Sequence, residues 1–277
     1  MIFKDFTFNF RSNLISFLKK KYYLSFLIRL FLLPYKYILS NLRNIFINKN
    51  IDKINFSNND HNLNDYLKYF DCDKSSLVHG YNKFYELELE KLKDSNLDIL
   101  EFGIHFGASQ AAFSKYFNRS NIIGVDKNPY HKKFFSKNIR SLYCDVSDQN
   151  SLKLLKDYLG IEFDLIIDDA SHIPKHQLKT FIEMFDVLKS KGLYVVEELD
   201  IFESYPENYN KNLDNNVSEI REILHHFKDK KGLNLDEITH NIQILSLAKK
   251  IEWVKIFRGD YFVNDRNVSE IAFIKKK

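Results

Sequence analysis

The sequence of 277 residues holds only two cysteines, Cys72 and Cys144. Two cysteines make no disulfide framework, and their spacing fits neither a CxxC redox pair nor a zinc cluster. Internal repeats of about 20–50 residues are also lacking, which argues against a solenoid or a propeller. These absences, together with a hydrophobic content of 44%, predict a globular protein of a reducing, cytoplasmic compartment with one sizeable core and an appendage.

Acidic residues are almost absent from residues 1–50, where Asp5 stands against nine lysines and arginines. This segment carries a net charge of +8, so the remaining residues carry −4 of the chain's total of +4. A mildly acidic remainder without a base-stacking motif argues against a nucleic-acid partner. Residues 1–50 also contain twelve aromatic residues and no alanine, so they lack an A-x-A site for signal-peptide cleavage.

The apolar run of residues 22–35 is too short for an ordinary transmembrane helix, and Arg29 interrupts it. We expect instead two amphipathic helices that break near Pro34. The lysines at 19–21, beside aromatic and aliphatic side chains, suit an anionic membrane surface and a peripheral position on the cytoplasmic face of the membrane. Alternatively, this basic aromatic arm packs on its own protein or joins the copies of a homo-oligomer.

Seven asparagines lie between residues 48 and 64, and large apolar residues are few there. This composition predicts a linker over residues 51–65. The chain then divides into the basic arm of residues 1–50, the linker, and one large domain over residues 66–277.

Short apolar runs, separated by segments of helical length, follow one another through residues 97–199. Each run ends in a glycine turn or in acidic residues, which is typical of parallel strands whose ends build a nucleotide site. We therefore predict an α/β fold with a mostly parallel, Rossmann-like sheet and an antiparallel last strand. The predicted strands are residues 98–102, 122–125, 142–144, 163–167, 192–196, 251–257 and 268–274; the predicted helices lie within 66–93 and 110–117, after residue 173, and over 216–226 and 236–249.

The turn after the first predicted strand contains Gly103 and Gly107, without a third glycine at dinucleotide spacing. Glycine lets the backbone approach a ligand closely. Glu101 stands two residues before the turn, where its carboxylate disfavours a pyrophosphate and suits the ammonium group of an amino-acid cofactor. The turn thus favours S-adenosylmethionine (SAM) over NAD. Asp126, after the second strand, is placed to bind both ribose hydroxyls, and Asp145, after the third, to face the adenine amino group.

Acidic residues also end the fourth and fifth strands, as Asp168-Asp169 and Glu197-Glu198, and His172 follows three residues after Asp169. The carboxyl ends of adjacent parallel strands meet at one edge of a sheet, so these groups converge. Packed carboxylates repel one another unless a cation joins them, and oxygen ligands suit Mg²⁺, Mn²⁺ or Ca²⁺. We predict a metal site here, with helix capping by Asp169 as the structural alternative.

Several longer motifs accompany these acids: Asp73-Lys74 with His79-Gly80-Tyr81 and Tyr85, LEFGIHFGAS at 100–109, IDDASHIPKH at 167–176, and GLYVVEE at 192–198. With them, the sequence resembles the metal-dependent sugar O-methyltransferases of the macrocin and mycinamicin type. It is also similar to the related rhamnosyl O-methyltransferase and cephalosporin hydroxylase group. The resemblance covers about residues 70–275.

This resemblance implies a class I SAM-methyltransferase sheet, with SAM and Mg²⁺ (or Mn²⁺) as cofactors. It implies methyl transfer to a sugar hydroxyl of a glycan, a lipid-linked saccharide or a glycosylated metabolite. By the same resemblance, Asp169, Glu197 and Glu198 bind the metal and His172 acts as the general base. Glu198 stands where the family usually has Asp, which leaves Asp200 as an alternative ligand.

Tyr81 and Asp168 are expected beside the cofactor. Two other functions are compatible with the same residues. A catechol-like phenol could chelate the metal through vicinal oxygens in place of a sugar. A non-catalytic scaffold on a membrane surface could retain the fold, although it would have no need to keep mutually repelling acids together.

Overall fold

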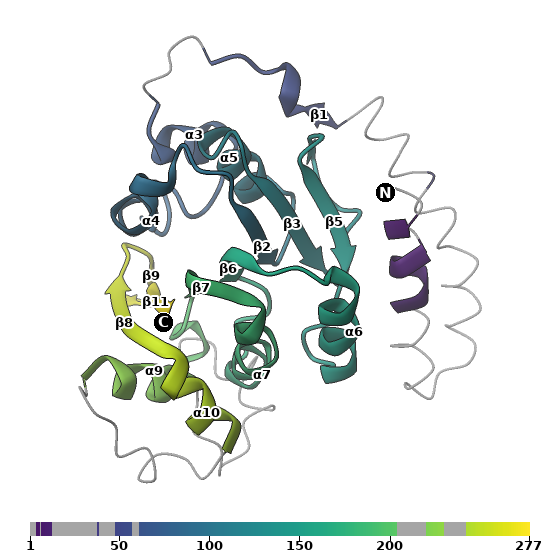
Figure 1. Ribbon diagram of the computed structural model, residues 1–277. Helices are drawn as coiled ribbons and strands as arrows, with labels where there is room; N and C mark the ends of the chain where they lie inside the picture. The colour runs from purple at the N-terminus through teal and green to yellow at the C-terminus, as the bar shows by residue number, and fades with distance from the viewer. Residues whose placement is uncertain are drawn as a thin grey trace.

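The computed structural model describes residues 4–5, 7–12, 38, 48–56, 61–203, 220–229 and 242–277 (Figure 1). The helices expected around Pro34, the lysines at 19–21, and parts of the helices expected at residues 216–226 and 236–249 lie outside the described residues. No helix in the described part of the chain is long and apolar enough to cross a membrane.

Seven strands form the central sheet: β2 (Asp98–Phe102), β3 (Asn121–Asp126), β5 (Ile139–Tyr143), β6 (Phe163–Asp168), β7 (Leu188–Val196), β8 (Ile251–Arg258) and β11 (Glu270–Lys276). Their spatial order is β5-β3-β2-β6-β7-β11-β8 (Figure 1). Neighbouring strands pair in parallel, except that β11 is antiparallel to both β7 and β8. The predicted mostly parallel α/β sheet with an antiparallel last strand is thus confirmed.

Helices cover both faces of this sheet (Figure 1). One face carries α3 (Leu63–Tyr69), α4 (Asn82–Leu89) and α5 (Ala108–Tyr116); the other carries α6 (Gln149–Leu159), α7 (Pro174–Met184), α9 (Ile220–Asp229) and α10 (Ile242–Lys250). Because successive strand residues point to opposite faces, Ile99 and Leu100 of β2 enter two different hydrophobic cores. The sheet is therefore buried on both sides, and its carboxyl edge is left to hold polar groups.

Short elements complete the described structure. Strand β1 (Lys49–Asn50) pairs with β4 (Phe134–Phe135), and β9 (Phe262–Val263) pairs with β10 (Arg266–Asn267) in a hairpin between β8 and β11. Strand β7 begins four residues earlier than predicted because buried Leu188 pairs with Phe163 of β6. Helices of the 3₁₀ type lie at Ile51–Lys53, Glu90–Leu92, Phe185–Val187 and Ile201–Glu203.

The predicted linker begins with Ile51, which is fully buried in the same core as α3. Its neighbour Asp52 accepts hydrogen bonds from the Ser136 hydroxyl (2.5 Å) and the Lys137 amide (3.1 Å). Strand β1 precedes it, and α3 begins at Leu63, within the predicted linker. The described part of this segment is thus tied to the large domain, and the three-part division of the chain stays a prediction.

Residues 4–5 and 7–12 are helical and lie beside β5 and α6 (Figure 1). The carboxylate of Asp5 accepts two hydrogen bonds from the Arg140 guanidinium (2.6 and 3.1 Å) and one from the Tyr158 hydroxyl (2.6 Å). The ring of Phe8 stacks on Tyr158 at a centroid distance of 3.9 Å. This part of the arm therefore packs on its own protein, as one of the two alternatives predicted.

Asn9 binds the outer edge of β5 with its side-chain amide. Its Oδ1 accepts the Tyr143 backbone N–H (2.7 Å), and its Nδ2 donates to the Ser141 carbonyl (3.4 Å). Asn9 itself is buried, so water cannot easily replace these bonds.

We predict that Asn9→Ala lowers the free energy of unfolding by about 1–3 kcal/mol, because a buried backbone donor loses its partner. Urea denaturation followed by circular dichroism measures the change. Arg11→Ala is the matched control on the same segment, since Arg11 is exposed. Equal stability of the Asn9 variant and the control would contradict the role given to Asn9.

Candidate active site

A buried lysine stands at the centre of the acidic cluster. The Nζ atom of Lys74 forms ion pairs with Asp169 and with Glu197 (3.1 Å), and lies 3.8 Å from Glu101 Oε1. Burial alone would lower the pKa of Lys74, but the surrounding carboxylates raise it well above its ordinary value. The surrounding carboxylates therefore favour the charged form of Lys74, and this charge keeps them together.

Asp169, His172 and Glu198 form a group suited to a metal ion. Their ligand atoms all lie within 4.8 Å of one another, and His172 Nε2 is 3.4 Å from Glu198 Oε2 and 3.8 Å from Asp169 Oδ1. The side chains of Asp169 and His172 remain 19% and 20% exposed, so a ligand can reach them. The two carboxylates offer the oxygen ligands that Mg²⁺ or Mn²⁺ prefers, and the imidazole of His172 lies beside them, so Asp169 and Glu198 fit the predicted metal.

The backbone explains why Glu198 and His172 face each other. Both residues adopt left-handed conformations, with φ of 54° and 52°. Such a conformation is uncommon for residues other than glycine and reverses the chain direction locally. The adjacent acids Glu197 and Glu198 have different partners: Glu197 pairs with Lys74, and Glu198 lies beside His172.

Glu197 is separated from this group by its own partners. Its side chain is 2% exposed, and besides Lys74 it accepts a 2.5 Å hydrogen bond from the Tyr85 hydroxyl. Asp200, the alternative ligand, accepts hydrogen bonds from Arg258 (2.5 Å) and from the Glu270 amide (3.0 Å). The structure thus brings Asp169 and Glu198 together with His172, and Glu197's place in a metal site stays a prediction.

His79 contacts the carboxylate oxygen of Glu198 that does not face His172. Its Nε2 lies 3.1 Å from Glu198 Oε1, and its Nδ1 lies 3.3 Å from the Ser269 hydroxyl. The His79 ring also stacks on Tyr81, at a centroid distance of 5.0 Å. Tyr81 is fully buried and lies on this side of the site, so it packs behind the acids.

Gly103 lets β2 and β6 approach closely at the carboxyl edge. It has φ of 95°, and a Cβ atom there would lie 2.0 Å from the carbonyl oxygen of Asp169. A side chain at this position would push the turn away from Asp169. The glycine turn was predicted to let the backbone approach a ligand. Gly103 does line a cavity, but it also approaches the backbone of Asp169.

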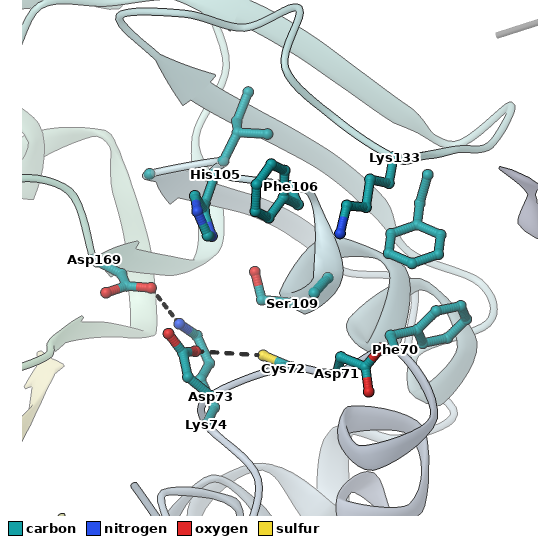
Figure 2. Close-up of a pocket in the computed structure, with 14 residues that line it drawn as sticks. Phe70, Asp71, Cys72, Asp73, Lys74, His105, Phe106, Ser109, Lys133 and Asp169 are labelled. Atoms are coloured by element: carbon teal, nitrogen blue, oxygen red, sulfur yellow. Dashed lines mark hydrogen bonds and ion pairs between the residues drawn. The ribbon is translucent and has the colours of Figure 1, made fainter. Parts of the chain in front are cut away.

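Two cavities open on either side of Gly103. One, of about 380 Å³, contains Asp126, Asp145 and Ser147 in its lining, and we call it the Asp126 cavity. The other, of about 250 Å³, is lined by residues 70–74, 103–106, 108–109 and 133–134 and by Asp169 (Figure 2). We call it the Lys133 cavity. Asp169 thus lines the Lys133 cavity and also belongs to the group of Asp169, His172 and Glu198, which we call the metal-type group.

Asp126 and Asp145 occupy their predicted places in the Asp126 cavity. Asp126 Oδ2 accepts the Ile104 amide (2.9 Å), which pins the glycine turn. Burial alone would raise the pKa of Asp145, but hydrogen bonds from Ser147 and the nearby charge of Lys127 (3.1 Å) lower it overall. Both acids therefore present negative charge to the cavity.

Other predicted cofactor residues line neither cavity: Glu101, Gly107, Asp168 and Tyr81. Glu101 is fully buried, and its oxygens accept from the Ser109 hydroxyl (2.6 Å) and Gln110 Nε2 (2.5 Å). Burial, partly offset by Lys74, raises the pKa of Glu101 to about 7. Direct contacts between these four residues and a cofactor stay predictions.

Asp168 is also turned into the protein. Burial and the neighbouring Asp169 raise the pKa of Asp168 to about 8, and its Oδ2 has no hydrogen-bond partner within the described residues. Gly107 instead begins α5 with φ of 79°, so its conformational freedom serves the turn.

Lys74, His79 and Tyr85 hold the acids in place, although no role was predicted for them from the sequence. The signal was present, because all three belong to the motifs that carry the resemblance. They lie before β2, far from the acids in sequence, and only the topology brings them to the carboxyl edge.

Curated relatives match about half of this chain. The chain is 32% identical over 131 residues to 8-demethyl-8-alpha-L-rhamnosyl tetracenomycin-C 2'-O-methyltransferase of Streptomyces olivaceus, covering 44% of this chain and 34% of the relative. It is 33% identical over 147 residues to L-olivosyl-oleandolide 3-O-methyltransferase of Streptomyces antibioticus, covering 50% of this chain and 37% of the relative. The chain is similar to sugar O-methyltransferases. The predicted resemblance is thus confirmed, although the matches span about a third of the length of these relatives.

No family model matches the chain. Among solved structures, it is similar to the MycE methyltransferase from the mycinamycin biosynthetic pathway, in complex with Mg, SAH and mycinamycin VI. The TM-score is 0.58 at 20% identity, and the match covers 79% of this chain and 55% of that chain. At this identity the likeness establishes the fold, and the predicted class I SAM-methyltransferase fold is confirmed.

We predict that Lys74→Met lowers the free energy of unfolding by about 3–5 kcal/mol, because it leaves buried carboxylates without their cation. Urea denaturation in the presence of EDTA measures the change without a compensating metal. Lys83→Met is the matched control: Lys83 pairs with Asp260 at 2.8 Å, but both side chains are largely exposed. That pair contributes about 0–1 kcal/mol, so equal losses in the two variants would contradict the central role of Lys74.

Proposed function

We propose that this protein is a SAM-dependent, divalent-metal-assisted O-methyltransferase that acts on a sugar hydroxyl. The observation that carries the proposal is the sharing of Asp169 between the Lys133 cavity and the metal-type group with His172 and Glu198. A methyl donor bound in the Lys133 cavity and an acceptor bound at the metal-type group would then meet beside Asp169. Such alignment of donor and acceptor is the main contribution an enzyme makes to a displacement reaction.

The two cavities support SAM as the donor. Asp126 would bind the ribose hydroxyls and Asp145 the adenine amino group, both from the Asp126 cavity. The Lys133 cavity, on the other side of Gly103, would take the amino-acid part. The MycE structure holds SAH and Mg, which agrees with these two cofactors.

The metal-type group supports a divalent cation, Mg²⁺ or Mn²⁺, as the second cofactor. Asp169 and Glu198 would hold it, and Glu197 would join them if it exchanged its Lys74 or Tyr85 contact for the metal. The bound cation would stabilise a sugar hydroxyl in its deprotonated form.

His172 is our candidate for the proton acceptor. Its Nε2 lies 3.4 Å from Glu198 Oε2 and 3.8 Å from Asp169 Oδ1, beside the two acids that would hold the cation, and imidazole is the side chain most often used as a general base. Lys74, held by Asp169 and Glu197, supplies the charge that fixes Asp169 in place before any ligand arrives.

The relatives favour a sugar acceptor over a catechol-like phenol. Their names describe methyl transfer to rhamnosyl and olivosyl groups of glycosylated small molecules. A glycosylated small molecule is therefore our first substrate class, with a glycan or a lipid-linked saccharide as further members. A non-catalytic scaffold is disfavoured because Asp169, His172 and Glu198 remain grouped and open to ligands.

We expect Asp169→Asn to abolish Mg²⁺-dependent methyl transfer to a sugar acceptor while SAM binding persists, because the substitution removes one anionic metal ligand. Isothermal titration calorimetry with SAM, with and without Mg²⁺, tests binding, and NAD serves as the negative ligand. Mn²⁺ binding followed by electron paramagnetic resonance tests the metal site independently of activity.

Asp157→Asn is the control for this experiment, since Asp157 is an exposed residue of α6. Full Mn²⁺ affinity in the Asp169 variant would refute the metal role. Absence of SAM binding by the wild-type protein would refute the methyltransferase proposal and leave the scaffold alternative.

The basic arm forms a separate part of the proposal. Its net charge of +8 and twelve aromatic residues support binding to an anionic membrane surface, where lipid-linked saccharides would be at hand. We expect the full chain to sediment with vesicles containing phosphatidylglycerol and to be released by high salt. Deleting residues 13–47 should abolish this binding and spare the packed residues 4–12. Undiminished vesicle binding by the deletion variant would refute the membrane role.

A further inference from the structure

His79 uses both of its ring nitrogens, although it lies outside the metal-type group. Its Nε2 lies 3.1 Å from Glu198 Oε1, and its Nδ1 lies 3.3 Å from the Ser269 hydroxyl, which is also 3.3 Å from the His79 carbonyl oxygen. A carboxylate only accepts hydrogen bonds, so the contact with Glu198 requires a hydrogen on Nε2. In the neutral ring, Nδ1 then accepts from the buried Ser269 hydroxyl.

The position of His79 is fixed by its backbone and by its ring. Its N–H donates to the Asp73 carbonyl (2.9 Å), and its carbonyl accepts from the Asp260 amide (2.7 Å). The centroid of its ring lies 5.0 Å from that of Tyr81 and 4.6 Å from that of Tyr261. Because His79 is only 5% exposed, its imidazole is held in one orientation before any ligand arrives.

The two carboxylate oxygens of Glu198 are used differently. Oε1 accepts from His79, whereas Oε2 lies 3.4 Å from His172 Nε2, which is in turn 3.8 Å from Asp169 Oδ1. Among the described residues, Glu198 is also the only acid within ion-pair distance of His79. Turning Glu198 to offer both oxygens to a cation would draw Oε1 away from the His79 ring. Glu198 is therefore arranged to offer one oxygen to the metal-type group.

Divalent cations differ in what they require of a carboxylate. Ca²⁺ takes about 6–8 oxygen ligands in a flexible arrangement and readily binds a carboxylate through both oxygens. Mg²⁺ requires a near-octahedral arrangement, and the two oxygens of one carboxylate lie too close together to fill two of its corners. Mn²⁺ also takes octahedral oxygen sites. A glutamate that offers a single oxygen thus suits Mg²⁺ or Mn²⁺ better than Ca²⁺.

We propose that His79 is a positioning residue that selects the cation: it holds Glu198 Oε1, leaves Oε2 alone for the metal, and thereby favours Mg²⁺ or Mn²⁺ over Ca²⁺. This assignment rests on the proposed function, since it requires a divalent cation at the metal-type group. It depends neither on SAM nor on the acceptor. The oxygen-rich strand ends alone left the choice among these three cations open.

The test measures the affinity of the full chain for Mn²⁺ by electron paramagnetic resonance, and for Ca²⁺ by its competition with Mn²⁺. His79→Leu removes the hydrogen bond to Glu198 and keeps a side chain of similar volume. Loss of the hydrogen-bond partner of a metal ligand should weaken Mn²⁺ binding about 10- to 100-fold. Ca²⁺ binding should weaken less, because the released carboxylate can bind Ca²⁺ through both oxygens. The preference for Mn²⁺ over Ca²⁺ should therefore fall.

Three further variants complete the design. His79→Gln should retain most of the preference, since its amide can donate in place of Nε2. His79→Phe keeps a ring beside Tyr81 and Tyr261 and removes the same donor, so it replaces His79→Leu if circular dichroism shows that variant to be unfolded. His131→Leu is the matched control and should change neither affinity, because His131 is exposed.

A purely structural role for His79 would weaken both cations equally. Equal weakening in the variants without a donor, unchanged Mn²⁺ affinity, or a His79→Gln variant that loses as much of the preference as His79→Leu would overturn the assignment and leave the proposed function intact. Failure of the wild-type protein to bind Mn²⁺ would overturn both this assignment and the proposed metal.

Discussion

The candidate site depends on one buried ion-pair cluster. Three carboxylates, of Glu101, Asp169 and Glu197, surround the ammonium of Lys74, which is itself almost fully buried. Without a cation, these acids would repel one another and take up protons, because burial strongly disfavours isolated negative charge. Lys74 permits the acids to gather at the ends of β2, β6 and β7, and the glycine turn and His79 then complete the site around them.

This cluster also divides the acids between two tasks. Glu197 faces inward to Lys74 and Tyr85, whereas Glu198 faces His79 and His172 at the reachable side. Both acids follow the end of β7 at Val196, and Glu198 has a left-handed backbone conformation there. Glu197 thus stabilises the buried cluster, whereas Glu198, the next residue in the sequence, lies where a ligand can reach it.

Much of this arrangement could be predicted from the sequence. The apolar runs ending in acids identified five parallel strands, and parallel strands must bring Asp126, Asp145 and Asp169 to one edge. Which of Glu197 and Glu198 faces His172 could not be predicted, because both acids follow the end of β7 at Val196 and only tertiary contacts distinguish their partners. Lys74 and His79 belong to motifs that carry the resemblance, but their contacts with the acids could not be predicted, since they reach the edge from before β2 through tertiary packing alone.

Asn9 has a consequence for how molecules of this protein meet. Strand β5 lies at one end of the sheet, and such a strand ordinarily offers free backbone groups to a strand from another molecule. Here the side-chain amide of Asn9 already occupies the Tyr143 N–H and the Ser141 carbonyl. A second chain could continue the sheet at this end only after displacing residues 7–12, so this part of the arm protects the protein against edge-to-edge aggregation.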